Sequence, residues 1–326
     1  MAVTDTQPGW DLEERIAFES SITGESSPTL SLHSESLTEI IDTNDPITQR
    51  QMATGQSMPR SENFVQGRPD PQASWNLPFT AINWALAATS LLQNVNHTGT
   101  KYVLTGQPSL VNVRNFFSLH QGKSSATTAK TAMRGRGGKV SQMTLRIPAV
   151  QGSDPGDVRI ASTLMFANAI RTATRLSNGG SHSRDTQTPL TTRDFALAIN
   201  TATKHFISGS VTFNSNTTKS QEAAATPGAM FLGPLTISGD LKVYTTTAND
   251  DPYDLLVDAH EAKTATELKL TATGGHFVSF DALIGPPQNR VESDIRVTTF
   301  AFQGFADDGT QPVIEAILAT AFPTWT

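Results

Sequence analysis

Residues 235–258 read LTISGDLKVYTTTANDDPYDLLVD, a strand pattern that leads into a helix start. In the first part Ile237, Leu241 and Val243 alternate with polar residues, which is the period of a half-buried strand. In the second part Asp251 is placed to cap a helix, and Pro252 suits the first helical position. The stretch therefore predicts a strand followed by a short helix.

The first half of the chain has the same order of patterns. Residues 74–79 predict a strand, Thr80 a helix cap, and residues 81–95 a helix with one apolar stripe. Further strands are expected at residues 102–104, 111–120, 140–147, 158–166, 195–199, 206–213, 266–271, 276–284, 294–302 and 313–318. The expected fold is mainly β with short helices, in two tandem β-sandwich or barrel modules that each have a flanking α-helix.

Composition shifts place the expected domain boundaries. A stretch rich in Gly, Ser and Thr separates the two halves and indicates a linker. The expected organisation is an extended N-terminal arm at 1–29, a first module at 30–175, a linker at 176–192, a second module at 193–320 and a C-terminal tail at 321–326.

The composition excludes several classes of protein. Lys plus Arg number 24 against 30 Asp plus Glu, and the net charge of −6 argues against a general nucleic-acid binder. The absence of cysteine excludes disulfides, thiolate catalysis and cysteine-ligated zinc. No apolar run reaches the roughly 20 residues of a membrane span, and the N-terminus does not resemble a secretory signal. We expect a soluble protein folded in a cytoplasm.

No residue pattern indicates catalysis or cofactor binding. The seven histidines are scattered without metal-ligand spacing, so no metal site and no cofactor are expected. Residues 134–139, RGRGGK, match no nucleotide-binding motif and predict a flexible basic turn before the strand at Val140. Asp251 and Asp254 are explained as partners of a helix start rather than as an acid–base pair. We expect that the protein is not an enzyme, with no catalytic and no specific nucleic-acid-binding residues.

Two long polar segments, residues 43–70 and 214–234, interrupt the strand patterns at corresponding places in the two halves. Connections of this length are usually either functional or disordered, and both interpretations stay open. If the segments are functional, they are arms that pack on a neighbouring subunit. The candidate contact residues are the large apolar ones: Met52, Met58, Phe64 and Val65 in the first segment, and Met230, Phe231 and Leu232 in the second.

Four stretches together resemble a known family. They are SWNLPFTAINWALAATSLLQ (74–93), MRGRGGKVSQMTLRIPAVQG (133–152), PLTISGDLKVYTTTANDDPYDLLVDAHEAKTATELKLT (234–271) and SDIRVTTFAFQGFADDGTQPVIEAIL (293–318). Their order resembles the tail tube proteins of long-tailed, siphovirus-like bacteriophages, in a two-module form.

The resemblance implies a structural virion protein that self-assembles into stacked rings, which form the tail tube and conduct double-stranded DNA during ejection. It implies inner sheets joined edge to edge, with three two-module copies giving a pseudo-sixfold ring. The implied partners are further copies of the chain and the tape measure, tail terminator and distal tail proteins, with no membrane. DNA would pass through the lumen without specific binding. The implied location is the virion tail, after synthesis in the host cytoplasm.

Two other classes of function remain open. One is a tandem β-sandwich binding module, for a carbohydrate or protein ligand, in another tail or surface structure. The other is a hydrolase with an unrecognised site. The 4 Trp and 3 Tyr do not cluster, which disfavours the aromatic platforms of sugar binding.

Overall fold

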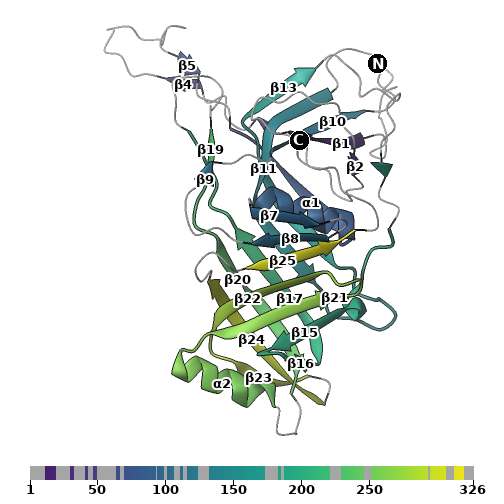
Figure 1. Ribbon diagram of the computed structural model, residues 1–326, viewed down its shortest axis with the longest axis vertical. Coiled ribbons are helices and arrows are strands. Elements are labelled where there is room, and N and C mark those ends of the chain that lie inside the picture. Colours follow the sequence, from purple (N-terminus) through teal and green to yellow (C-terminus); the bar gives the residue numbers. More distant parts are fainter. Residues whose placement is uncertain are drawn as a thin grey trace.

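The fold is mainly β with two short α-helices (Figure 1). The computed structural model describes residues 12–19, 30–32, 41–42, 47–49, 64–66, 70–92, 94–98, 101–105, 111–112, 116–123, 132–172, 183–184, 187–220, 229–245, 251–292, 294–305 and 312–318. Within them, 20 strands form one hydrogen-bonded network, which is antiparallel except for one short parallel pair.

One layer of this network, named here the long sheet, has eight strands. Its spatial order is β3 (Ile41–Asp42), β6 (Pro71–Pro78), β12 (Arg159–Met165), β11 (Ala132–Ile147), β17 (Phe206–Asn214), β20 (Thr236–Tyr244), β24 (Ile295–Phe305) and β23 (Gln288–Glu292). Strand alternation puts one apolar face toward the core, as the period of 2 in these segments predicts.

A second layer, named here the second sheet, packs against that apolar face. Its order is β16 (Ala202–Lys204), β15 (Phe195–Ile199), β21 (Thr266–Ala272), β22 (Phe277–Ile284), β25 (Val313–Ile317), β8 (Lys101–Thr105) and β7 (Asn94–Thr98). The end of β22 also pairs with β24, so the two layers are continuous at that corner.

Smaller groups of strands extend from this sandwich. The first part of β11 pairs with β13 (Asn168–Thr172) and β10 (Phe116–Lys123), which continues through β1 (Leu12–Glu19) and β2 (Leu30–Leu32) to β14 (Ser183–Arg184). A three-stranded sheet joins β18 (Thr218–Lys219), β19 (Met230–Leu232) and β9 (Val111–Asn112), and β4 (Ile47–Gln49) pairs with β5 (Phe64–Gln66). A 3-10 turn, η3, covers Thr192–Asp194.

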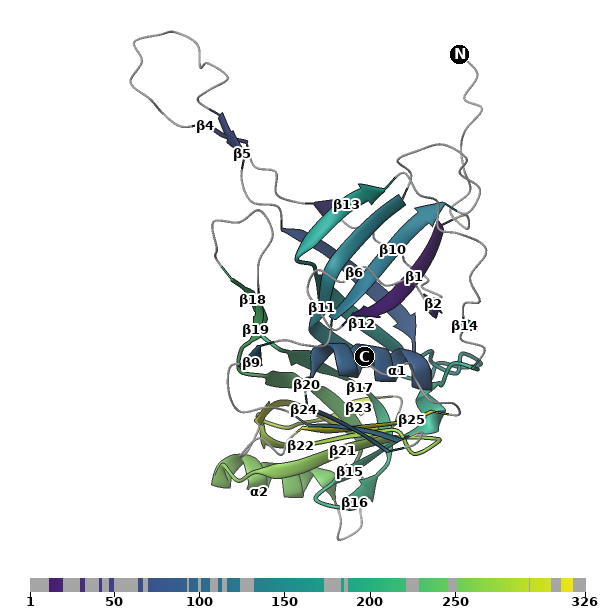
Figure 2. The ribbon, with the colours of Figure 1, turned by 45° about the horizontal axis from the view of Figure 1, so that its top comes forward.

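The two helices begin where the sequence predicts and differ in burial. Thr80 Oγ1 accepts from Asn83 N at 3.2 Å before α1 (Ala81–Leu91), and Asp251 Oδ1 accepts from Tyr253 N at 2.9 Å before α2 (Pro252–Ala262). Figure 2 shows α1 in the middle of the molecule and α2 at its lower end. The expected extension of the first helix to residue 95 is wrong, because residues 94–98 pair with β8 as β7.

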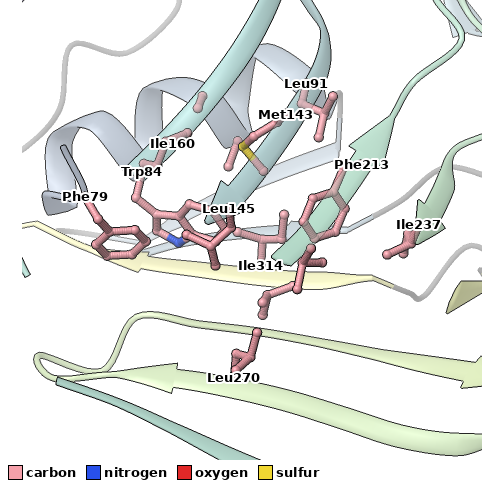
Figure 3. Close-up of a cluster of buried hydrophobic side chains, with 14 of the residues drawn as sticks. Phe79, Trp84, Leu91, Met143, Leu145, Ile160, Phe213, Ile237, Leu270 and Ile314 are labelled. Carbon is pink, nitrogen blue, oxygen red and sulfur yellow. The ribbon is translucent and has the colours of Figure 1, made fainter. Parts of the chain in front are cut away.

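The core lies between the two layers and around α1. Trp84 of α1 donates from Nε1 to the carbonyl of Glu315 in β25, at 3.1 Å. Phe280 of β22 lies 6.3 Å from Phe213 and 5.3 Å from Phe302, between ring centroids, so rings of both layers meet. Figure 3 shows side chains of the helix, the long sheet and the second sheet converging in this cluster.

The structure does not show the two expected sandwich modules as separate units. One core cluster contains residues of both halves, and β11 of the first half pairs with β17 of the second over six residue pairs. Part of the expected linker is also bonded to the fold, because Gln187 accepts from Ala81 N at 2.9 Å and Leu190 N donates to Phe79 O. The expected strands at residues 158–166 and 313–318 lie in different layers, since β12 pairs with β6 and β11, whereas β25 pairs with β22 and β8.

Candidate functional site

The long sheet has one face that the rest of the described chain leaves largely uncovered, named here the polar face. In β11, Met143, Leu145 and Ile147 are buried in the core, and the alternate residues Thr144 and Arg146 point to the opposite side. The same alternation holds in β12 and β20. The strands together therefore present a broad surface of small polar side chains.

The strand register aligns these side chains into rows across the sheet. At the centre, Thr144 and Thr212 share a hydrogen bond of 3.0 Å between their hydroxyl oxygens. The central row reads Asn76, Ala161, Thr144, Thr212, Ser238 and Gln303. This row of described residues contains no ionisable group.

Charges on the polar face are of both signs, and two of the cations, Arg159 of β12 and Arg146 of β11, are direct register partners. Arg159 contacts Asp157 at 3.1 Å, and Lys242 forms an ion pair with Glu292 of β23. Ion pairs of this kind at a surface stabilise little, but each places a carboxylate beside a cation of the polar face.

A second group of charges lies in another row of the polar face, which runs across β11, β17 and β20. Arg146 pairs in register with Ser210, which pairs with Asp240. Ser210 Oγ donates to Asp240 Oδ1 at 2.6 Å. The cation and the carboxylate are two strands apart, so both signs are interspersed here as well.

The long sheet ends at β23 on one side. Within the described chain β23 pairs with β24 alone, and all five of its residues are exposed, with Val291 at 67%. Arg296 is opposite Val291, and the Arg296 carbonyl accepts from Thr245 N on its other side. The Val291–Arg296 pair is therefore a non-hydrogen-bonded one, which directs the Val291 N–H to the free edge. Such an edge offers unpaired donors and acceptors to another strand.

The opposite end of the long sheet is formed by β3 and β6. β3 pairs through Ile41 and Asp42 with β6, and in the described chain no other strand pairs with β3. Within the described residues, the long sheet thus has two open ends.

The described part of the second candidate arm, residues 214–220 and 229–234, contacts the first half of the chain through β19. β19 pairs with β9, and Met230 and Leu232 are 0% and 7% exposed in a cluster with Phe116 and Ala167. Met230 and Leu232 are therefore buried within the single chain, and their role as contacts between subunits stays a prediction. Phe231 is partly exposed. Lys219 of the same segment forms an ion pair with Asp70.

The first candidate arm contains the β4–β5 pair. Phe64 and Val65 belong to β5, and their side chains lie outside the described part of the structure. Met52 and Met58 lie outside the described residues altogether. Their role as contact residues stays a prediction.

The expected flexible turn at residues 134–139 is wrong, because these residues are part of β11. Glycine makes this possible: a Cβ on Gly135 would lie 2.5 Å from the Phe166 ring, and one on Gly138 2.7 Å from the Phe117 ring. The rings occupy the space that side chains would take, and Gly137 has a φ of 59° where the strand bends. The basic residues of this segment therefore lie in a strand: Arg134 and Arg136 are partly buried, and Lys139 is fully buried.

Polar side chains that sequence patterns did not bring together meet on β1, β10 and β11. Ser118 Oγ donates to Glu19 Oε1 at 3.0 Å and lies 3.2 Å from His120 Nε2, and Glu19 lies 3.7 Å from an Arg134 nitrogen. Ser118 is 0% exposed. This cluster therefore lacks the access that a nucleophilic site needs.

Comparison with known proteins gives no identification: no protein-family model matches the chain, and no curated protein matches it either. In the described residues no group of three or more His, Asp or Glu side chains is arranged to hold a metal ion. Neither α-helix described is long and apolar enough to cross a bilayer.

Proposed function

We propose that this chain is the structural subunit of a phage tail tube, which assembles into stacked rings around a lumen that conducts double-stranded DNA. The observation that carries the proposal is the long sheet, with its polar face and two open ends. The subunit would reside in the virion tail after synthesis in the host cytoplasm. Its partners would be further copies of itself and the tape measure, tail terminator and distal tail proteins.

The order of strands supports a doubled unit. The sheet order β3–β6–β12–β11 is followed by β17–β20–β24–β23. In each set a short hairpin separates the first two strands along the chain, β4–β5 in one and β18–β19 in the other. A capped helix follows the second strand of each set, and the last two strands form an antiparallel pair. On this basis three copies supply six units to a ring.

The doubled order also supports a specific joint between copies. β11 and β17 connect the two sets inside the chain, and their counterparts at the free ends are β23 and β3. Pairing β23 of one copy with the β3–β6 edge of the next would repeat the β11–β17 joint. If every copy pairs with the next in this way, the copies close into a ring and no strand of the long sheet is left as a free edge.

The polar face would then line the lumen. Hydroxyl and amide groups keep water at the wall, and interspersed charges avoid a basic track that would retain phosphates. This matches the net charge of −6.

The test is a backbone change on the free edge. Val291→Pro removes the N–H that points away from β24, and its effect on the intrachain ladder is small because edge strands tolerate proline. Wild-type protein is expected to form rings or hollow tubes by negative-stain microscopy, and Val291→Pro to stay small by sedimentation with an unchanged circular dichroism spectrum.

Val291→Ala is the matched control, because it keeps the N–H and shortens an exposed side chain; it should assemble like wild type. Wild-type protein that stays monomeric under all conditions contradicts the proposal and favours a ligand-binding module. If Val291→Pro forms tubes as the wild type does, the proposed pairing of β23 with the next copy is contradicted.

A further inference from the structure

β25 holds the two halves of the second sheet together. On one side residues Val313 to Glu315 pair with β22, and on the other side all five residues of β25 pair with β8 of the first half. Among the described strands β25 alone pairs with both β22 and β8. Whatever loosens it separates the two halves of this layer.

A turn with two glycines brings a histidine against the end of β25. Gly274 and Gly275 have φ values of 93° and 87° between β21 and β22. A Cβ on Gly275 would lie 2.8 Å from Ile317 Cδ1, so the glycine gives Ile317 the room to approach. His276 follows directly, and Ala272 N donates to the His276 carbonyl at 2.7 Å.

The contact fixes the protonation state of the imidazole. Ile317 N donates to His276 Nδ1 at 3.1 Å. A backbone N–H is a donor only, so Nδ1 must present its lone pair and the ring proton must be on Nε2. The imidazole is 7% exposed and lies against the Phe79 ring, with 6.2 Å between centroids.

We propose that His276 is an acid-sensitive latch, which holds the end of β25 while the imidazole is neutral and releases it on protonation. Protonation places a second N–H at Nδ1, facing the Ile317 N–H, and the hydrogen bond is replaced by a contact between two donors. This device is independent of the proposed function.

The surroundings of His276 decide the pH at which the latch opens. A small apolar cavity beside it is lined by Phe79 and Trp84, by Leu145 of β11 and by Phe195 of β15, among others. The charged group that acts on His276 is Glu315 of β25, which forms an ion pair of 2.8 Å with Lys101 of β8. The neighbouring strand β21 carries Glu267 and Lys269, and β22 carries Asp281.

Burial lowers the pKa of His276, and the charge of Glu315 opposes this in part. Because the folded pKa lies below the unfolded value of 6.5, the unfolded chain takes up the proton first as pH falls. The contribution of neutral His276 to the stability of the fold is complete above pH 6.5. It is lost as the pH falls from 6.5 toward the pKa of the folded state.

His260 provides a control within the same molecule. Its Nδ1 lies 2.8 Å from the carbonyl oxygen of Ile284, so Nδ1 donates. Protonation of His260 at Nε2 leaves that bond intact, and no latch behaviour is expected from it.

The experiment compares the full-length wild type with His276→Asn and His260→Asn. The Asn amide oxygen replaces Nδ1 as an acceptor but does not titrate. Between pH 7 and pH 5 the folding equilibrium constant of the wild type should fall more than that of His276→Asn, since asparagine does not titrate and the pKa of folded His276 is lowered by burial. His260→Asn keeps the contact between His276 and Ile317 and should lose β25 protection at low pH as the wild type does.

Hydrogen exchange measured by mass spectrometry supplies a local readout that works on monomers and assemblies alike. Peptides that contain Ile317 should lose protection at pH 5 in the wild type and retain it in His276→Asn. Equal pH slopes for wild type and His276→Asn, or β25 protection that does not change with pH, overturn the proposal. If His276→Asn does not fold, the test uses the wild type and His260→Asn. Loss of protection of the Ile317 peptides at pH 5 in both proteins supports the proposal, and protection that does not change with pH overturns it.

Discussion

Replacing Lys139 by methionine tests the energetics of the bend in β11. Lys139 is 0% exposed, and burial lowers its pKa from 10.5 to about 7. The unfolded chain keeps its proton up to about pH 10.5, whereas the folded chain releases it near pH 7. The unfolded state therefore binds more protons between these values, and the free energy of unfolding rises with pH across this window.

The size of the effect follows from the shift. At 1.36 kcal/mol per unit of pKa, the change from 10.5 to about 7 corresponds to about 5 kcal/mol of buried-charge penalty at neutral pH and below. Methionine has a similar volume and no charge, but it also loses the polar interactions of the ammonium. We therefore expect Lys139→Met to be more stable than wild type at pH 7 by about 1–4 kcal/mol.

Urea unfolding at pH 7 and pH 9 measures the prediction. As the pH rises from 7 to 9, the free energy of unfolding of the wild type should increase relative to that of Lys139→Met by about 1.4 kcal/mol for each pH unit. Lys139→Arg is the control, because arginine stays charged at both pH values and should be destabilised at both. A difference between wild type and Lys139→Met that does not change between pH 7 and pH 9 refutes the reasoning, whatever its sign.

Two further substitutions test packing and are measured by the same unfolding assay. Gly239→Ala would bring a Cβ to 2.0 Å from the Ser210 carbonyl oxygen, and we expect a loss of about 3 kcal/mol. Gly285→Ala, where the nearest atom to the new Cβ is 3.2 Å away, should lower the free energy of unfolding clearly less. Equal losses for the two variants would show that the steric clash at Gly239 is not the cause. Trp84→Phe removes the hydrogen bond to Glu315 and part of the ring, and a loss of about 2 kcal/mol is expected. A change below the error of the assay would show that α1 does not hold β25.

The features that sequence patterns predicted correctly are local ones. Strand β20 and the start of α2 lie where alternation and the Asp251 cap put them, and Thr80 caps α1. Each depends on residues a few positions apart, since a cap needs one side chain and its nearest backbone donors. The mainly β class follows from the same local periods.

The features that were missed depend on residues far apart in the chain. The basic stretch at residues 134–139 has no strand pattern of its own, because the Phe117 and Phe166 rings take the place of its missing side chains. The pairing of β25 with β8 joins segments about two hundred residues apart, and no local period indicates it. The polar face was foreseeable strand by strand, but its rows depend on the register between strands.

One edge of each layer bears on the proposed assembly through the long sheet. In the second sheet, β16 at one end has three residues, Ala202–Lys204, and follows a turn at Asn200 and Thr201. An edge this short offers little to another strand. β23 has five exposed residues, and the N–H of Val291 points outward. A proline within the strand would protect that edge, and β23 contains none, which is expected of an edge that another copy completes. Its two charged residues are Arg290 and Glu292, and Pro286 and Pro287 lie directly before it. The long sheet would then be the continuous inner wall and the second sheet the outer layer.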